Sequence, residues 1–202
     1  MPLGATQLDG RRVAERLGAA LPGIVTASTE MWVEVASDRV QEALRWLHDS
    51  EEFDAAQLSN LTAVDRHTYF EVVYHLQSLD LNHLIEVKAI VRNHEDPLLP
   101  SAYPVYKGAL LQEREVFDLM GIRFDGHPDL RRIFLWEGYP GHPLRKDFLG
   151  LDQLTPGLGH FPYEDRANPS RQLNRDNLLS REGVSQEMPP EAGGGAVAGS
   201  GH

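Results

Sequence analysis

Hydrophobic residues in the first fifty positions recur at two different spacings. The apolar residues of 8–21 recur at helical spacing and predict a short helix, for which Asp9 suits the N-cap position. Residues 23–36 alternate loosely between apolar and polar side chains and predict a two-stranded ribbon. Helical spacing returns at 40–47, with a polar cap expected at 37–38, so a second helix is predicted after the ribbon.

Three longer segments, 55–65, 68–79 and 83–92, are rich in β-branched and aromatic residues. In the last two, apolar residues alternate with mixed ones, so each predicted strand has one apolar face. The connections are too short for crossover helices, which argues against a doubly wound parallel sheet. The pattern predicts the α+β class: a mostly antiparallel sheet covered by helices on one face and followed by an extended C-terminal arm.

A proline-rich connection, 93–104, is predicted to be irregular and to precede a helix over 105–121 that ends at Gly121. Polar residues of this helix form one stripe, but Glu113 lies within the apolar arc, where an unpaired carboxylate is costly to bury. Glu113 is therefore expected to have a cationic or hydrogen-bonding partner. The cations available in the following segment are Arg131, Arg132, Arg145 and Lys146.

The charged residues of this helix suit three interpretations. As a general acid/base pair, Glu113 and Glu115 are poorly placed, because positions two apart on a helix point in well-separated directions. A solvated helix face would pair Arg114 with Asp118 at (i, i+4), but that interpretation leaves Glu113 unexplained. An interface or a buried network accounts for Glu113, Arg114, Glu115 and Asp118 together.

Two turns with the same sequence, Gly-His-Pro, follow at 126–128 and 141–143. Their histidines, His127 and His142, are candidate metal ligands, since neutral imidazole binds zinc well. No spacing of the HExxH type holds them together, however, and a residue before proline is kept extended. Each histidine is more simply a turn residue whose ring hydrogen-bonds to nearby backbone.

Helical and strand periods end at Leu149, so 1–149 is predicted to be the α+β domain. We expect 150–180 to be an extended arm, because both periods are lost there. The stretch 181–202 is expected to be a disordered glycine-rich tail, because it cannot bury enough apolar surface to order itself. Aromatic residues embedded in the arm favour its docking on another protein.

Composition limits the classes of partner and cofactor. The formal charge of −11 argues against nucleic acid, since phosphate binding depends on clustered lysine and arginine. The chain has no cysteine, which excludes disulfides and cysteine-ligated iron–sulfur clusters within it. No run of about 18 apolar residues and no signal-peptide core occurs, so a cytosolic, water-soluble chain is expected.

The stretch EREVFDLMGIRFDGHPDLRRI, followed by GHPLRKDF, resembles the C subunit of the bacterial proton-pumping NADH:quinone oxidoreductase, respiratory complex I. The strong agreement is confined to this segment, and weaker agreement in order and spacing extends back to about Asp54. The resemblance implies no catalytic, cofactor-binding or metal-binding residue in this chain. It marks twelve residues as interface or structural positions: Glu113, Arg114, Glu115, Asp118, His127, Pro128, Arg131, His142, Pro143, Arg145, Lys146 and Asp147.

The resemblance implies a non-catalytic structural subunit of the peripheral, hydrophilic arm of the complex. Its expected partners are chiefly the D subunit of the quinone module, with the B and I subunits. Its expected place is the cytoplasmic side of the inner membrane, reached only through the complex. Flavin mononucleotide, iron–sulfur clusters and quinone are expected in partner subunits and not in this chain. In this role the chain braces the quinone-module and iron–sulfur subunits while electrons pass from NADH to quinone and protons are translocated.

The resemblance also suggests roles for the marked residues. Glu113 and Arg114 are expected to hold the helix on its domain, and the two Gly-His-Pro turns with 145–147 to dock on the D subunit. Two other functions remain open at this point. One is the equivalent subunit of a related membrane-bound hydrogenase or dehydrogenase complex, and the other is a stand-alone metal-dependent hydrolase that uses the two histidines and Asp129.

Overall fold

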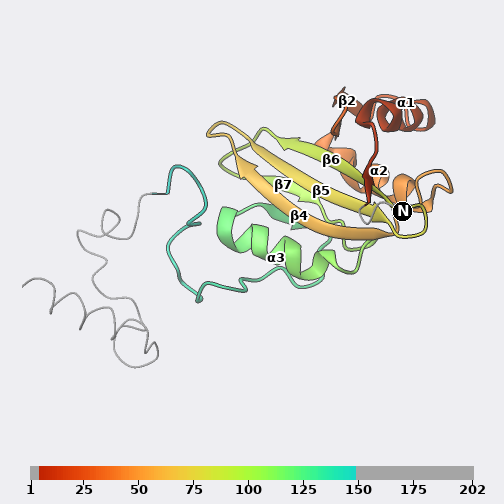
Figure 1. Cartoon of the computed structure of the whole chain (residues 1–202). Helices are drawn as coiled ribbons and strands as arrows, with labels where there is room; N and C mark the ends of the chain where they lie inside the picture. The colour runs from red at the N-terminus through yellow and green to blue at the C-terminus, as the bar shows by residue number, and fades with distance from the viewer. Residues whose placement is uncertain (1–4, 149–202) are drawn as a thin grey trace, which may run out of the picture. The chain divides into compact units, whose positions relative to one another are not determined.

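The computed structural model describes residues 5–148 of the chain. The longest elements of this part are the strands β4, β5 and β6 and the helices α1, α2 and α3 (Figure 1). In chain order the elements are β1 (Thr6–Gln7), α1 (Gly10–Ala20), β2 (Val25–Ser28), β3 (Val33–Val35), the 3-10 helix η1 (Ser37–Arg39), α2 (Val40–Asp49), β4 (Gln57–Asp65), β5 (Phe70–Ser78), β6 (His83–Val91), β7 (Leu98–Pro100), α3 (Ala109–Met120) and β8 (Arg123–Asp125).

The main sheet has the strand order β2-β3-β6-β5-β4, and β1 adds to β6. Strands β4, β5 and β6 form an antiparallel meander, and β2 pairs antiparallel with β3. Only β1 and β3 run parallel to their neighbour β6 in the described part of this sheet. The predicted α+β class with a mostly antiparallel sheet is therefore confirmed.

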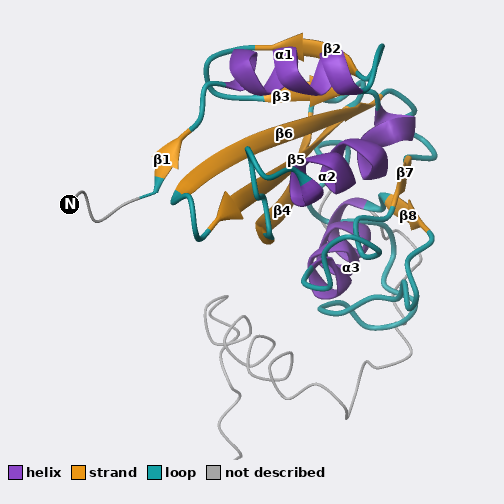
Figure 2. Cartoon of the chain, turned by 90° about the vertical axis from the view of Figure 1, so that its right-hand side faces the viewer, coloured by secondary structure: helices purple, strands orange, loops and turns teal. Residues whose placement is uncertain are grey.

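One face of the sheet forms the core. The pairing register places Leu61, Tyr74, Val87 and Val33 side by side across four strands, and all four are buried. Each helix adds apolar residues to the same cluster, and in Figure 2 α1 and α2 lie in front of the sheet. The helical residues of this cluster include Val13 and Leu17 of α1, Ala43, Leu44 and Leu47 of α2, and Ala109 and Val116 of α3.

The start of α1 confirms the predicted cap, and the start of α2 does not. The side chain of Asp9 accepts a hydrogen bond from the backbone N–H of Arg11 at 2.9 Å. Before α2, however, residues 37–39 themselves form η1, and Arg39 precedes the helix without a side-chain cap. The polar pair at 37–38 was the wrong choice of cap because the chain already turns helically there.

Two predictions around the proline-rich connection are wrong. The segment 93–104 is not irregular throughout, since it contains β7, which pairs parallel with β8. The helix α3 begins at Ala109 and not at residue 105. The N–H groups of Val105 and Tyr106 both bond to the carbonyl of Ala102 in a preceding turn. This turn leads Tyr106 into the core, where its hydroxyl donates to the carbonyl of Ala55 at 2.7 Å.

The predicted arm (150–180) and tail (181–202) lie outside the described residues. Within 5–148, no helix is long and apolar enough to cross a membrane.

Candidate functional site

The carboxylate of Glu113 is buried between α3 and the loop that follows β7. It accepts a hydrogen bond from the hydroxyl of Ser101 at 2.7 Å and one from the backbone N–H of Ala102 at 2.6 Å. Its side chain is fully buried, as expected for its position in the apolar arc. Of the two kinds of partner expected, the hydrogen-bonding one is present, and the four candidate cations do not bind Glu113 in the described residues. Glu113 thus joins α3 to the loop that follows β7.

Burial raises the pKa of Glu113 to about 7, and the bonds from Ser101 and Ala102 only partly oppose this rise. The phenol of Tyr74 is also buried, and burial together with the nearby Glu113 charge raises its pKa. His127 Nε2 lies 3.9 Å from the Glu113 oxygen that accepts from Ser101. That distance exceeds hydrogen-bond range, so the carboxylate depends on its neutral donors.

Replacing Glu113 by glutamine should make stability less sensitive to pH. The pKa of Glu113 is about 7 in the folded chain, and its ordinary value is 4.5. The cost of burying the charged carboxylate is therefore absent below about pH 4.5, where the group is protonated in both states, and complete above about pH 7. Between pH 5 and 8 the free energy of unfolding of the glutamine variant should therefore gain about 2–3 kcal/mol relative to the parent. Urea denaturation at both pH values measures this difference, with Glu115→Gln as the exposed control. An equal difference at both pH values contradicts the assignment.

Asp118 is fully buried and organises the segment after β8. One carboxylate oxygen accepts the consecutive backbone N–H groups of residues 133–135 at 3.0, 2.7 and 2.9 Å. The other accepts from Arg132 Nη1 at 2.9 Å. Burial alone would raise the pKa of Asp118, but these donors outweigh it and hold the pKa below its ordinary value. The solvated-stripe interpretation of Asp118 is therefore wrong, and the buried-network interpretation describes it.

Arg114 does not pair with Asp118. Its guanidinium donates to the carbonyl of Arg131 and to that of Arg132, each at 3.0 Å. Arg131 itself is exposed and its guanidinium donates to Asp129 at 3.0 Å. Arg114 and Asp118 thus bind the same loop through different backbone groups. Arg114 donates to its carbonyl groups, and Asp118 accepts from its N–H groups.

The two Gly-His-Pro turns are held against α3 through their histidines. His127 Nε2 lies 3.0 Å from the carbonyl of Leu110, and its Nδ1 accepts the backbone N–H of Asp129 at 3.0 Å. These partners assign the ring proton to Nε2. His142 Nδ1 lies 2.9 Å from the carbonyl of Asp118, and burial is the main cause that lowers the pKa of His142.

Both rings therefore hydrogen-bond to backbone, as the turn interpretation predicted. Pro128, after the first histidine, is exposed, and Pro143, after the second, is half-buried. Among residues 5–148, no three metal-binding side chains gather in a group that could hold an ion. In this arrangement the two histidine rings bind backbone groups, and the Asp129 carboxylate accepts from the Arg131 side chain.

Gly121 ends α3 and provides the space that His142 fills. Its φ of +74° lies in the left-handed region, and its N–H bonds to the carbonyl of Phe117 at 2.8 Å. A Cβ at this position would come within 2.5 Å of the His142 ring. Glycine is therefore required here both by the backbone conformation and by the packing of the second turn.

The run 145–147 binds its own domain at two points. Arg145 Nε donates to the carbonyl of Met120 at 2.7 Å, and its guanidinium lies 5.2 Å from the ring centre of Phe70. The backbone N–H of Lys146 donates to Asp65 at 2.8 Å, across 81 positions of sequence. Asp147 is exposed.

Asp65, the last residue of β4, was missed by sequence reasoning. It is 3% exposed and also accepts from the N–H of His67 and from His94 Nε2, at 2.7 and 3.0 Å. Burial would raise its pKa, but these bonds and that of Lys146 more than offset the rise and lower it. The only sequence signal was an acidic residue at the end of a predicted strand. Its main partners are backbone groups, which no pattern of side chains reveals.

The site is thus a network in which α3 holds the segment 126–148 by polar contacts along its whole length. The chain is similar to a known family over this segment and beyond it. The family described as "Respiratory-chain NADH dehydrogenase, 30 Kd subunit" matches residues 33–153.

Individual relatives carry the same kind of name. The C subunit of NADH-quinone oxidoreductase from Caulobacter sp. (strain K31) is 45% identical over 155 residues, which are 71% of this chain and 72% of the relative. The protein of that name from Roseiflexus sp. (strain RS-1) is 43% identical over 156 residues, 73% of this chain and 89% of its own. A chain in the structure of the membrane-bound sulfane sulfur reductase, an archaeal respiratory membrane complex, has the same fold. It superposes with a TM-score of 0.59 at 23% identity, over 79% of this chain and 95% of that one.

Proposed function

This chain belongs to the family of the 30 kDa subunit of respiratory-chain NADH dehydrogenase, whose bacterial members are named as C subunits of NADH-quinone oxidoreductase, and we propose that it is a non-catalytic structural subunit of that complex. Its partners are then other subunits of the complex, and its process is respiratory electron transport. We place it in the peripheral arm, where it binds chiefly the D subunit, with the B and I subunits, on the cytoplasmic side of the inner membrane. Its membrane association comes only through the complex.

The proposed contribution is geometric. Electron transfer from NADH to quinone requires flavin, iron–sulfur clusters and quinone to be held at fixed separations, and these groups belong to partner subunits in this proposal. The chain has no cysteine with which to ligate a cluster itself. By bracing the iron–sulfur and quinone-module subunits, it supports electron transfer and the coupled proton translocation without carrying an electron.

The observation that carries the proposal is a fixed loop with an exposed aromatic ring. Asp118 accepts the backbone N–H groups of Phe134 and of the residues before and after it. Arg114 donates to the backbone carbonyl groups of residues 131 and 132, just before this stretch. Yet the Phe134 side chain is 63% exposed and Ile133 beside it is 37% exposed. An apolar ring on a pre-ordered backbone costs little entropy to bury, which suits a subunit interface.

Substituting Phe134 by alanine tests this interface. We expect it to weaken binding to the partner subunits by about 10- to 30-fold, the loss typical of an aromatic interface anchor. The stability of the isolated chain should stay within about 0.5 kcal/mol, because the ring is mostly exposed. The readout is the amount of intact peripheral arm recovered from cells together with NADH:quinone reductase activity.

Leu79→Ala is the matched control, because Leu79 is 65% exposed in the turn between β5 and β6. Asp147→Ala probes the second proposed contact, the exposed end of the basic-acidic run. Arg145 is less informative, since its guanidinium already holds Met120 within the chain. Normal assembly and activity in both the Phe134 and the Asp147 variants would contradict docking through this segment.

A further inference from the structure

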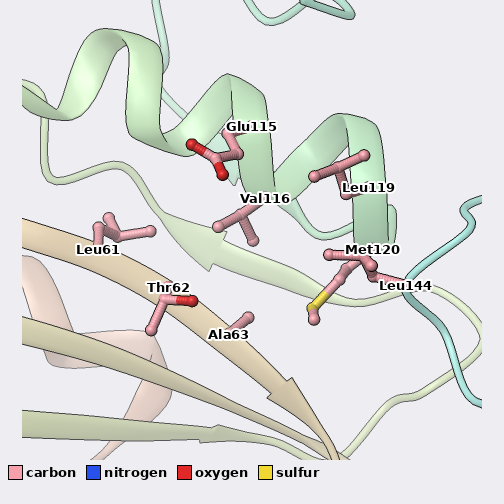
Figure 3. Close-up of a pocket in the computed structure, with 8 residues that line it drawn as sticks. All are labelled: Leu61, Thr62, Ala63, Glu115, Val116, Leu119, Met120 and Leu144. Atoms are coloured by element: carbon pink, nitrogen blue, oxygen red, sulfur yellow. The ribbon is translucent and has the colours of Figure 1, made fainter. Parts of the chain in front are cut away.

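A groove runs between α3 and the edge of the main sheet. Figure 3 shows residues 61–63 of β4 on one side and Leu144 beside Met120 at one end. On the other side it shows four side chains of α3, those of Glu115, Val116, Leu119 and Met120. Three consecutive residues of β4 line it, so the groove follows the strand backbone and not a single face of the sheet. Its empty volume, open solvent included, is about 250 Å³, which is room for a few side chains.

The strand that borders this groove lies at the edge of the main sheet, next to α3, and has no strand partner on one side within the described residues. Within residues 5–148, β4 pairs only with β5. An edge strand leaves backbone N–H and C=O groups free to pair with another chain, and proteins usually guard it with charge, proline or a bulge. Here a register shift between Leu58 and Asn60 interrupts only the first half. The second half, Leu-Thr-Ala-Val at 61–64, is regular and has neither charge nor proline.

The α3 side of the groove carries an unpaired charge between two apolar residues. Glu115 is exposed, and no partner for its carboxylate occurs in the part of the chain that the structure describes. Leu111 lies one turn before it and is 54% exposed, and Leu119 lies one turn after it in the groove lining. Leu144, at the end of the groove, is also 54% exposed. Apolar residues around one free carboxylate indicate an occupant that is apolar and carries a cation.

We propose that the groove and the free edge of β4 together bind an extended segment of a neighbouring subunit, which pairs with β4 as an added strand, inserts an aliphatic side chain and directs a lysine or arginine to Glu115. Backbone pairing gives such an added strand its affinity, and the side-chain contacts give it specificity. This inference rests on the proposed function, because it takes its occupant from the same complex.

Charge favours a neighbour over the two other sources of a strand. A second copy of this chain would add another Glu115 and another net charge of −11. The chain's own sequence from 149 to 165 contains no lysine or arginine, and its first charge, Asp152, has the same sign as Glu115. Residues 149–202 as a whole contain four arginines, the first of them Arg166, against seven carboxylate side chains. Both sources therefore bring more negative than positive charge, which disfavours them beside an unpaired carboxylate.

The test places a photo-reactive benzophenone side chain at position 111 of the tagged full-length chain, expressed with the rest of the complex. After irradiation of the purified assembly, mass spectrometry identifies the linked peptides. We expect a link to one segment of another subunit that combines aliphatic residues with a lysine or arginine. The same group at position 79 should not link to that segment. Glu115→Lys should lower the yield of the link about fivefold or more, and Glu115→Gln should lower it less.

Links to residues 149–202 of the same chain, links to a second copy, or no link from position 111 would each overturn the proposal. An unchanged yield in Glu115→Lys would remove the ionic part of it. These failures differ from failure of the proposed function. If other complex subunits purify with the chain but position 111 links to none of them, only the groove assignment is lost. If no complex subunit purifies with the chain, the proposed function fails.

Discussion

Replacing Asp118 by alanine should lower the free energy of unfolding by about 3–5 kcal/mol, the usual loss when one side of a buried charged network is removed. The variant leaves the N–H groups of 133–135 and the guanidinium of Arg132 without their acceptor. Since a domain is stabilised by only about 5–15 kcal/mol, the loss is a large part of the total. Chemical denaturation monitored by circular dichroism measures it.

The matched control is Glu115→Ala, which removes a carboxylate three residues earlier on the same helix. Glu115 is exposed and has no partner in residues 5–148, so its loss should change stability by no more than about 0.5 kcal/mol. Proteolysis should also cleave the segment 126–148 faster in the Asp118 variant than in the control. Equal stability of the two variants would show that Asp118 does not organise this segment.

Replacing Gly121 by alanine should have the next largest effect, a loss of about 2–4 kcal/mol from left-handed backbone strain combined with overpacking. The new methyl group would come within 2.5 Å of the His142 ring and force it away. The ring would then lose its bond to the carbonyl of Asp118, which is 2.9 Å long in the parent. Thermal unfolding gives the loss in stability, and the NMR signals of His142 report whether the ring has moved.

Gly138→Ala separates the two causes. Gly138 also has a positive φ, +86°, but no atom of the described residues lies within 4 Å of the position that a Cβ would take. Its substitution should therefore cost only the backbone term, about 1–2 kcal/mol. If both alanine variants lose the same stability, His142 adapts freely and the packing argument is wrong.

The sheet could be predicted from sequence because its long strands alternate over most of their length. In β6, the residues from Ile85 to Val91 alternate between buried and half-buried positions, which is the period that the sequence shows. The short strands β1, β7 and β8 span only two or three residues each. Such lengths contain no measurable period, and their pairing depends on where the longer elements bring them.

The candidate site was predictable only in part. Helical spacing correctly singled out Glu113 as a carboxylate inside an apolar arc. It could not identify Ser101 and the N–H of Ala102 as partners, because a loop conformation sets their position. For Asp118 the sequence left a solvated helix face and a buried network as alternatives, and helical spacing alone could not decide between them. The partners of Asp118 are mostly backbone N–H groups, which every residue except proline has and which therefore leave no mark on the sequence.

The measurement that tests the central claim most directly is purification of the tagged full-length chain from its native cells in mild detergent. Subunit masses and NADH:quinone reductase activity are then determined on the purified material. A structural subunit should bring down the other subunits of the complex in stoichiometric amounts, together with their flavin, their iron–sulfur clusters and the reductase activity. Recovery of the chain as a monomer without companions or reductase activity would contradict the proposed role.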